Sequence, residues 1–143
     1  MKISIGADHG GFELKVKLAE FLKLSGHTVI DNGTNSADSV DYPDYAKLVA
    51  HDILEERADY GVLICGSGIG ISIAANRFAG IRAALVTRKE YAELSRAHNN
   101  ANIIVFGGRF TTIEEAKEYL QIFLSTPFEG GRHEKRVCKI DSE

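Results

Sequence analysis

Residues 61–70 have the sequence GVLICGSGIG, a short apolar run that leads into a glycine-rich turn. The run from Gly61 to Ile64 shows no alternation of polar and apolar residues, which is typical of a strand buried on both faces of a parallel sheet. A helix is predicted directly after the turn, over 69–78. This stretch therefore predicts a strand, a tight turn and a helix at the centre of a layered α/β fold.

The same alternation of strands and helices extends to both ends of the chain. Short β-branched runs predict strands, and apolar residues at helical spacing among lysines and glutamates predict helices. The predicted strands are 2–5, 27–30, 61–64, 81–86 and 103–106, and the predicted helices are 12–24, 43–57, 69–78, 88–97 and 112–124. We expect one domain over 1–143, a doubly wound, Rossmann-like sheet of five parallel strands with helices on both faces.

Two local signals refine this prediction. Thr112 and Glu115 have the spacing of a capping box at the start of the last predicted helix. A break from Pro127 to Gly131 separates that helix from a basic C-terminal segment. We expect residues 127–143 to form an arm that contacts a neighbouring subunit.

The composition limits the classes of partner. The chain has 143 residues, 44% of them apolar, and a formal net charge of −3, so nothing predicts nucleic acid or an anionic membrane as the main partner. Apolar runs such as 103–106 are too short to span a bilayer. Cys65 and Cys138 lie in different contexts without metal-ligand spacing, which argues against a disulfide framework and favours a reducing cytoplasm.

The turn after Cys65 combines two chemical features. In doubly wound folds the ligand lies beyond the carboxyl ends of the strands, here the loops at Asp8, Cys65 and Gly107. Glycines allow backbone N–H groups to converge on a negative oxygen, and the start of a helix adds its positive end. A thiol at this junction is expected to have a lowered pKa. The loop therefore offers both a base and an oxyanion cradle.

Three other interpretations of the loop after Cys65 compete with a base and an oxyanion cradle: a core cysteine, a dinucleotide-binding loop and a thiol phosphatase. Cys65 is alternatively a buried core cysteine, with glycines that serve only the turn. A dinucleotide-binding loop is weakly supported, because the motif follows the third strand and no acidic residue closes the next one. A thiol phosphatase requires an arginine where Ile71 and Ser72 stand, which excludes that class.

Three further polar segments are candidates for binding. Asp8-His9-Gly10-Gly11 lies at the start of a helix and suits a phosphate or a sugar hydroxyl, or else it is a capping turn. The segment 98–102 joins a histidine to amides, or else it ends a helix. Arg132 and Arg136 lie one helical turn apart, which suits a phosphate, although most basic runs are only solvated. No cluster of His, Asp and Glu in the sequence indicates a metal site.

Six segments together resemble one known family, the type B ribose-5-phosphate isomerases with the galactose-6-phosphate isomerase subunits. They span nearly the whole chain in the expected order, so the resemblance is more specific than one glycine loop. They are IGADHGG (5–11), DYPDYA (41–46), CGSGIGISIAANR (65–77), AHNNANI (97–103), FGGR (106–109) and FEGGRHEKR (128–136). The resemblance implies a cytoplasmic aldose–ketose isomerase of the pentose phosphate pathway that interconverts D-ribose 5-phosphate and D-ribulose 5-phosphate without cofactor or metal.

The resemblance also implies a role for each matching residue. Cys65 would move the proton between C1 and C2, with Ser67 at a position where the family often has threonine, and His98 would open the furanose ring. The site is shared between subunits in this family, which implies a homodimer or a dimer of dimers. Binding roles are implied for Gly66, Gly68, Gly70 and Asn99 at the enediolate, for Asp8 and Tyr42 at the sugar hydroxyls, and for His9, Arg109, Arg132 and Arg136 at the phosphate.

Three alternatives stay open. The same chemistry on a six-carbon sugar phosphate, such as allose or galactose 6-phosphate, would differ in pocket length. A non-catalytic sugar-phosphate binding module would keep the glycines and arginines but would not need Cys65 or His98. A redox sensor based on Cys65 is disfavoured because no second cysteine lies nearby to form a disulfide.

Overall fold

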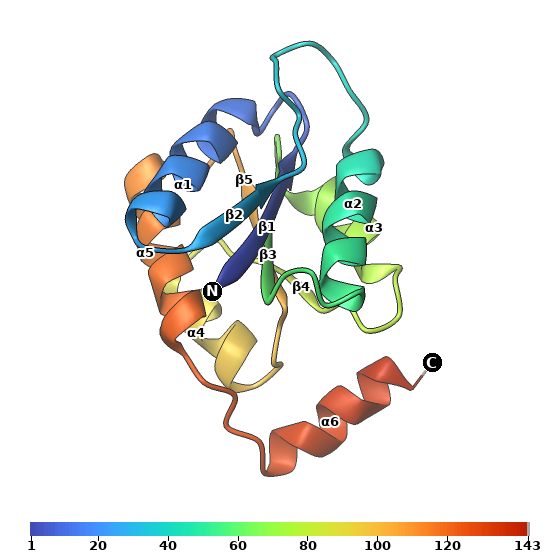
Figure 1. The fold of residues 1–143 in the computed structure, drawn as a ribbon. Coiled ribbons are helices and arrows are strands. Elements are labelled where there is room, and N and C mark those ends of the chain that lie inside the picture. The colour runs from blue at the N-terminus through green and yellow to red at the C-terminus, as the bar shows by residue number, and fades with distance from the viewer. Residues whose placement is uncertain (143) are drawn as a thin grey trace.

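The computed structural model describes residues 1–142 and contains a five-stranded parallel sheet flanked by helices (Figure 1). The strand order is β2-β1-β3-β5-β4, which confirms the predicted α/β fold. The strands are β1 (Lys2–Ala7), β2 (Thr28–Asp31), β3 (Tyr60–Cys65), β4 (Ala83–Leu85) and β5 (Ile103–Gly107). The helices are α1 (Phe12–Leu24), α2 (Tyr42–Leu54), α3 (Ile69–Asn76), α4 (Lys89–Ala97), α5 (Ile113–Ser125) and α6 (Arg132–Asp141).

The central strand β3 divides its side chains between two hydrophobic clusters. Val62 and Ile64 pack with α1, α4 and α5 on one face of the sheet, whereas Leu63 and Cys65 pack with α2 and α3 on the other. All four of these side chains are buried, which explains why β3 has no polar alternation. The thiol of Cys65 therefore lies on the face that α2 and α3 cover.

The helix boundaries follow the local signals with small shifts. The predicted capping box is present at α5, where the Thr112 side chain accepts a hydrogen bond from the Glu115 N–H and the Glu115 side chain accepts one from the Thr112 N–H. Helix α2 ends at Leu54 rather than at the predicted residue 57, and Glu56 beyond it takes a positive φ of 58°.

A buried carboxylate links β1 to the end of α2. Asp52 accepts hydrogen bonds from Ser4 Oγ at 2.7 Å, from Asn32 Nδ2 at 2.9 Å and from Arg57 Nε at 2.9 Å. Burial alone would raise the pKa of Asp52, but hydrogen bonds from Asn32, Ser4 and Arg57 outweigh burial and lower it. The network holds α2 in place against the sheet on the face that carries Cys65.

Helix α6 lies apart from the two helix layers (Figure 1). At its N-terminal side, the Glu129 N–H donates to the carbonyl oxygen of Ala97 at 3.0 Å. At its other end, Arg82 Nη1 pairs with Asp141 Oδ2 at 2.7 Å. The predicted basic arm is thus helical and contacts the start of the strands rather than their carboxyl ends. Across the described residues, no helix is long and apolar enough to cross a membrane.

Candidate functional site

The loops after β1, β3 and β5 meet at the carboxyl edge of the sheet. The Gly108 N–H donates to the Cys65 carbonyl oxygen at 2.8 Å, and the Arg109 N–H donates to the Gly66 carbonyl oxygen at 3.0 Å. A Cβ atom on Gly10 would lie 2.9 Å from the Gly66 nitrogen, so the first loop touches the second. The structure therefore joins the three loops that the sequence singled out.

The Cys65 thiol lies buried at the end of β3 and receives a backbone hydrogen bond. Its Sγ is 3.2 Å from the Gly68 nitrogen, which donates to it. Gly68 has a φ of +79°, and a Cβ there would lie 2.5 Å from Leu85 Cδ1, so the turn requires glycine. The glycine-rich turn thus directs an N–H group at the thiol.

Two further predicted residues border the same turn. Ser67 is exposed, and its Oγ accepts a hydrogen bond from the Ile69 N–H at 3.1 Å. The guanidinium of Arg109 packs against Gly66, where a Cβ would lie 3.1 Å from Arg109 Cζ. A pocket of about 300 Å³ is lined by Ser67 together with Phe110 and Tyr119.

Tyr42, Asp8 and His9 complete this edge. The Tyr42 ring reaches from the start of α2 to α3, where a Cβ on Gly70 would lie 2.7 Å from Tyr42 Cζ. Asp8 is buried, and its Oδ1 accepts from the Gly10 N–H at 2.8 Å. It does not cap α1, because the capping position is Gly11. His9 Nδ1 accepts from the Val40 N–H at 3.2 Å, which attaches the long loop before α2 to this edge.

Four predicted residues lie elsewhere. The register of β3 and β5 pairs Gly61 with Ile103 and Cys65 with Gly107, so the turn before β5 lies one strand length, roughly 13 Å, below Cys65. That turn and the adjoining α6 carry the remaining residues, which are His98, Asn99, Arg132 and Arg136. One chain therefore forms two separate groups of predicted site residues, at opposite edges of its sheet.

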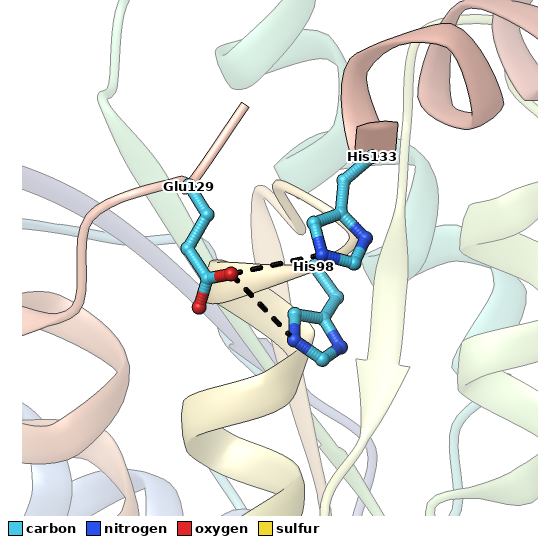
Figure 2. Close-up of side chains that lie close together, drawn as sticks. All are labelled: His98, Glu129 and His133. Carbon is cyan, nitrogen blue, oxygen red and sulfur yellow. Dashed lines mark ion pairs between the residues drawn. The ribbon is translucent and has the colours of Figure 1, made fainter. Parts of the chain in front are cut away.

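The second group contains two residues that the sequence analysis did not identify. The rings of His98 and His133 stack with their centroids 4.1 Å apart and an interplanar angle of 13°. Glu129 Oε1 lies 3.9 Å from His98 Nε2 and 3.6 Å from His133 Nε2 (Figure 2). The spacing of four residues between Glu129 and His133 was a sequence signal for their pairing. The stacking of His133 on His98 joins distant segments, and no sequence signal indicated it.

The electrostatics of this cluster favour a neutral His133. Its ring is buried, and desolvation lowers the pKa of His133, with further lowering from the charges of His98, Arg132 and Arg136. Glu129 opposes this change by attracting the protonated ring.

The cluster also has the residue types of a metal site. His98, Glu129 and His133 each offer a ligand atom, and these atoms lie within 4.8 Å of one another, contrary to the expectation that no such cluster exists. A metal ion, however, binds in the plane of each imidazole ring, along the nitrogen lone pair. The planes of two stacked rings inclined by 13° meet only far beyond metal-bonding distance, so one ring would have to rotate before both could bind one ion.

The chain matches a known family over most of its length. A family model described as Ribose/Galactose Isomerase matches residues 3–140. Ribose-5-phosphate isomerase B of Escherichia coli is 48% identical over 97% of this chain and 93% of its own length. Galactose-6-phosphate isomerase subunit LacB of Clostridium acetobutylicum is 41% identical over 97% of this chain and 80% of its own length.

Solved structures give the same result for the fold. A ribose 5-phosphate isomerase from Thermotoga maritima superposes with a TM-score of 0.98 at 55% identity, covering 99% of this chain and 98% of that one. The type B ribose 5-phosphate isomerase of Trypanosoma brucei superposes with a TM-score of 0.95 at 42% identity, covering 99% of this chain and 97% of that one.

Proposed function

Because the chain belongs to the Ribose/Galactose Isomerase family, we propose that it interconverts D-ribose 5-phosphate and D-ribulose 5-phosphate, with Cys65 as the base. The relatives named as ribose-5-phosphate isomerases support the substrate. The hydrogen bond from the Gly68 N–H to Cys65 Sγ supports the base, because it holds the sulfur in the glycine-rich turn at the carboxyl edge of the sheet.

The proposed chemistry needs a base and a site for the developing oxyanion. A hydrogen on carbon next to a carbonyl is weakly acidic, so its removal needs a positioned base and stabilisation of the enediolate. The thiolate of Cys65 takes the proton from one carbon and returns it to the other, and a second proton moves between the two oxygens, so that the hydroxyl and the carbonyl exchange places. The N–H groups of Gly68 and Ile69 are already bound to Cys65 Sγ and Ser67 Oγ, so the other N–H groups of residues 66–70 are the candidate oxyanion donors. A well-placed oxyanion donor contributes about 3–4 kcal/mol to such a step. Arg109 and His9 bind the phosphate.

We propose further that the active site is completed by a second copy of the chain. The strand register separates His98 and Asn99 from Cys65 by about one strand length, and the Glu129–Ala97 hydrogen bond attaches the segment that leads into α6 to the same distant edge. Ile69 and Ile73 are 55% and 61% exposed on one side of α3, directly after the Cys65 turn. Exposed neighbouring apolar residues favour a protein interface. A partner chain packed there would bring its own His98 and Arg136 to the turn.

Activity of the wild type and of Cys65→Ala on ribose 5-phosphate tests the function and the base together. We expect turnover by the wild type and a loss of at least about a hundredfold in kcat for the variant, because the base is removed. Cys138→Ala, at an exposed cysteine, is the matched control and should keep full activity.

Each other result has a definite meaning. An active Cys65→Ala enzyme would remove Cys65 as the base but keep the reaction. A wild type that converts only allose or galactose 6-phosphate would replace the substrate with the six-carbon alternative. A folded wild type that converts none of these sugars would contradict the proposed function and favour a binding module.

A further inference from the structure

We propose that His133 and Glu129 are positioning residues that hold the His98 imidazole in the orientation needed to open the furanose ring of the substrate. This inference rests on the proposed function and on its assignment of ring opening to His98. It adds two residues that act on the sugar only through His98. The observations that carry it are the ring stack, the position of the carboxylate and the backbone contact that fixes that carboxylate.

Ring opening needs one well-aimed proton carrier. The C1–O4 bond breaks and its electron pair goes to O4, which takes a proton from His98. The 1-hydroxyl loses its proton to solvent as the C1 carbonyl forms, and solvent returns a proton to His98. No oxidant or reductant takes part. The step fails if the imidazole rotates, because proton transfer requires hydrogen-bond distance to O4.

The stack restrains that rotation. His98 lies at the C-terminal end of α4, and its side chain is 36% exposed, so solvent alone would leave the ring free to turn. The His133 ring covers one face of it at 4.1 Å and is itself only 9% exposed. Turning His98 about its last side-chain bond would break this contact. His133 is held in turn by its N–H, which donates to the Gly130 carbonyl oxygen at 3.0 Å.

Glu129 determines which nitrogen of the His98 ring faces the protein and which faces the substrate. Its N–H is bound to the Ala97 carbonyl oxygen at 3.0 Å, next to His98 in the chain, so its position relative to His98 is set by the backbone. The carboxylate faces His98 Nε2 at 3.9 Å, within ion-pair distance. The other nitrogen, Nδ1, points away from the carboxylate (Figure 2) and has no hydrogen-bond partner among residues 1–142. It is the nitrogen available to O4.

Two reactions separate ring opening from the chemistry at Cys65. Ribulose 5-phosphate is an open chain, because its 5-oxygen carries the phosphate and its 4-hydroxyl is too close to the ketone to close a ring. Exchange of its C1 hydrogen with D₂O, followed by NMR, therefore needs the base and the enediolate but not ring opening. Conversion of ribose 5-phosphate needs the base, the enediolate and ring opening.

The variants are His133→Ala, which removes the stack, and Glu129→Gln, which keeps the backbone contact and removes the charge. We expect each to slow conversion of ribose 5-phosphate by about tenfold or more while C1 exchange stays within about twofold of wild type. His98→Asn should show the same split. His51→Ala is the matched control, since His51 also faces a glutamate four residues away, Glu55, on the distant helix α2; it should change neither rate.

The outcomes are distinguishable. An equal loss of both rates in Glu129→Gln and His133→Ala would overturn the inference and assign the two residues to folding or assembly. Unchanged conversion in both variants would overturn it as well. A wild type that neither exchanges nor converts its sugar would contradict the proposed function itself, before any variant is considered. If His133→Ala does not fold, Glu129→Gln alone decides, because its side chain is 58% exposed.

Discussion

At the scale of single residues, the glycines around Cys65 have different physical roles. Gly68 is required by the backbone, because its φ is positive and a side chain would strike Leu85. Gly70 has an ordinary φ, and the atoms nearest to a Cβ there all belong to the Tyr42 side chain. That ring belongs to a side chain that is 38% exposed and can move. Gly70 is therefore a position where a small change reaches the site without breaking the fold.

Gly70→Ala is predicted to displace the Tyr42 ring and weaken substrate binding. A Cβ 2.7 Å from Tyr42 Cζ forces the ring to shift, so we expect KM for ribose 5-phosphate to rise about three- to tenfold. Steady-state kinetics and a melting curve check this, with the melting temperature nearly unchanged. In a Tyr42→Ala background the effect of Gly70→Ala should disappear. A full effect in that background would show that Gly70 acts through another contact.

At the scale of elements, α6 is held at both ends by contacts that depend on charge. Its N-terminal side carries the stacked His133, and its C-terminal end carries the Arg82–Asp141 pair. The neutral form of His133 suits the buried stack, because desolvation and then the charges of His98, Arg132 and Arg136 oppose its protonation and only Glu129 favours it. The attachment of α6 should therefore depend on pH.

Acidification is predicted to loosen α6 through His133. The pKa of His133 is lowered in the folded chain from its ordinary value of about 6.5. The unfolded chain then binds more protons than the folded chain, so the free energy of unfolding falls as pH drops below about 6.5 and stops falling below the folded pKa. Melting temperatures at about pH 7.5 and about pH 5.5, at one protein concentration, measure this. His133→Phe, which keeps a ring without a titrating group, should show a smaller decrease than wild type; an equal decrease would contradict the prediction.

The elements also show what a sequence can predict. The strand β3 and the capping box of α5 depend on residues close together in the chain, and both were predicted from local patterns. The turn at Cys65 was predicted for the same reason. The stack of His98 on His133 depends on how the segment after α5 crosses the end of α4. No local pattern encodes that crossing, so Glu129 and His133 were missed.

At the scale of the whole molecule, two groups of site residues lie at opposite edges of one sheet. A two-fold axis between two chains would place the Cys65 edge of each against the His98 edge of the other, and such an interface uses the same surface of both chains. The exposed Ile69 and Ile73 lie on the side of α3 next to the Cys65 turn, where that interface would cover them. A dimer of this form would contain two complete sites, each with residues from both chains.

Mixing two inactive variants tests this arrangement. Cys65→Ala and His98→Asn are each expected to be inactive or nearly so as separate homodimers. A mixed dimer with shared sites contains one site that has lost both residues and one that keeps Cys65 from one chain and His98 from the other. Random pairing after joint refolding makes half of the dimers mixed, so we expect about one quarter of wild-type activity. Sites built within one chain would give no recovery at all, because every chain in the mixture lacks one of the two residues. Light scattering on the same samples should show dimers or larger assemblies, and a fully active monomer would contradict the shared site directly.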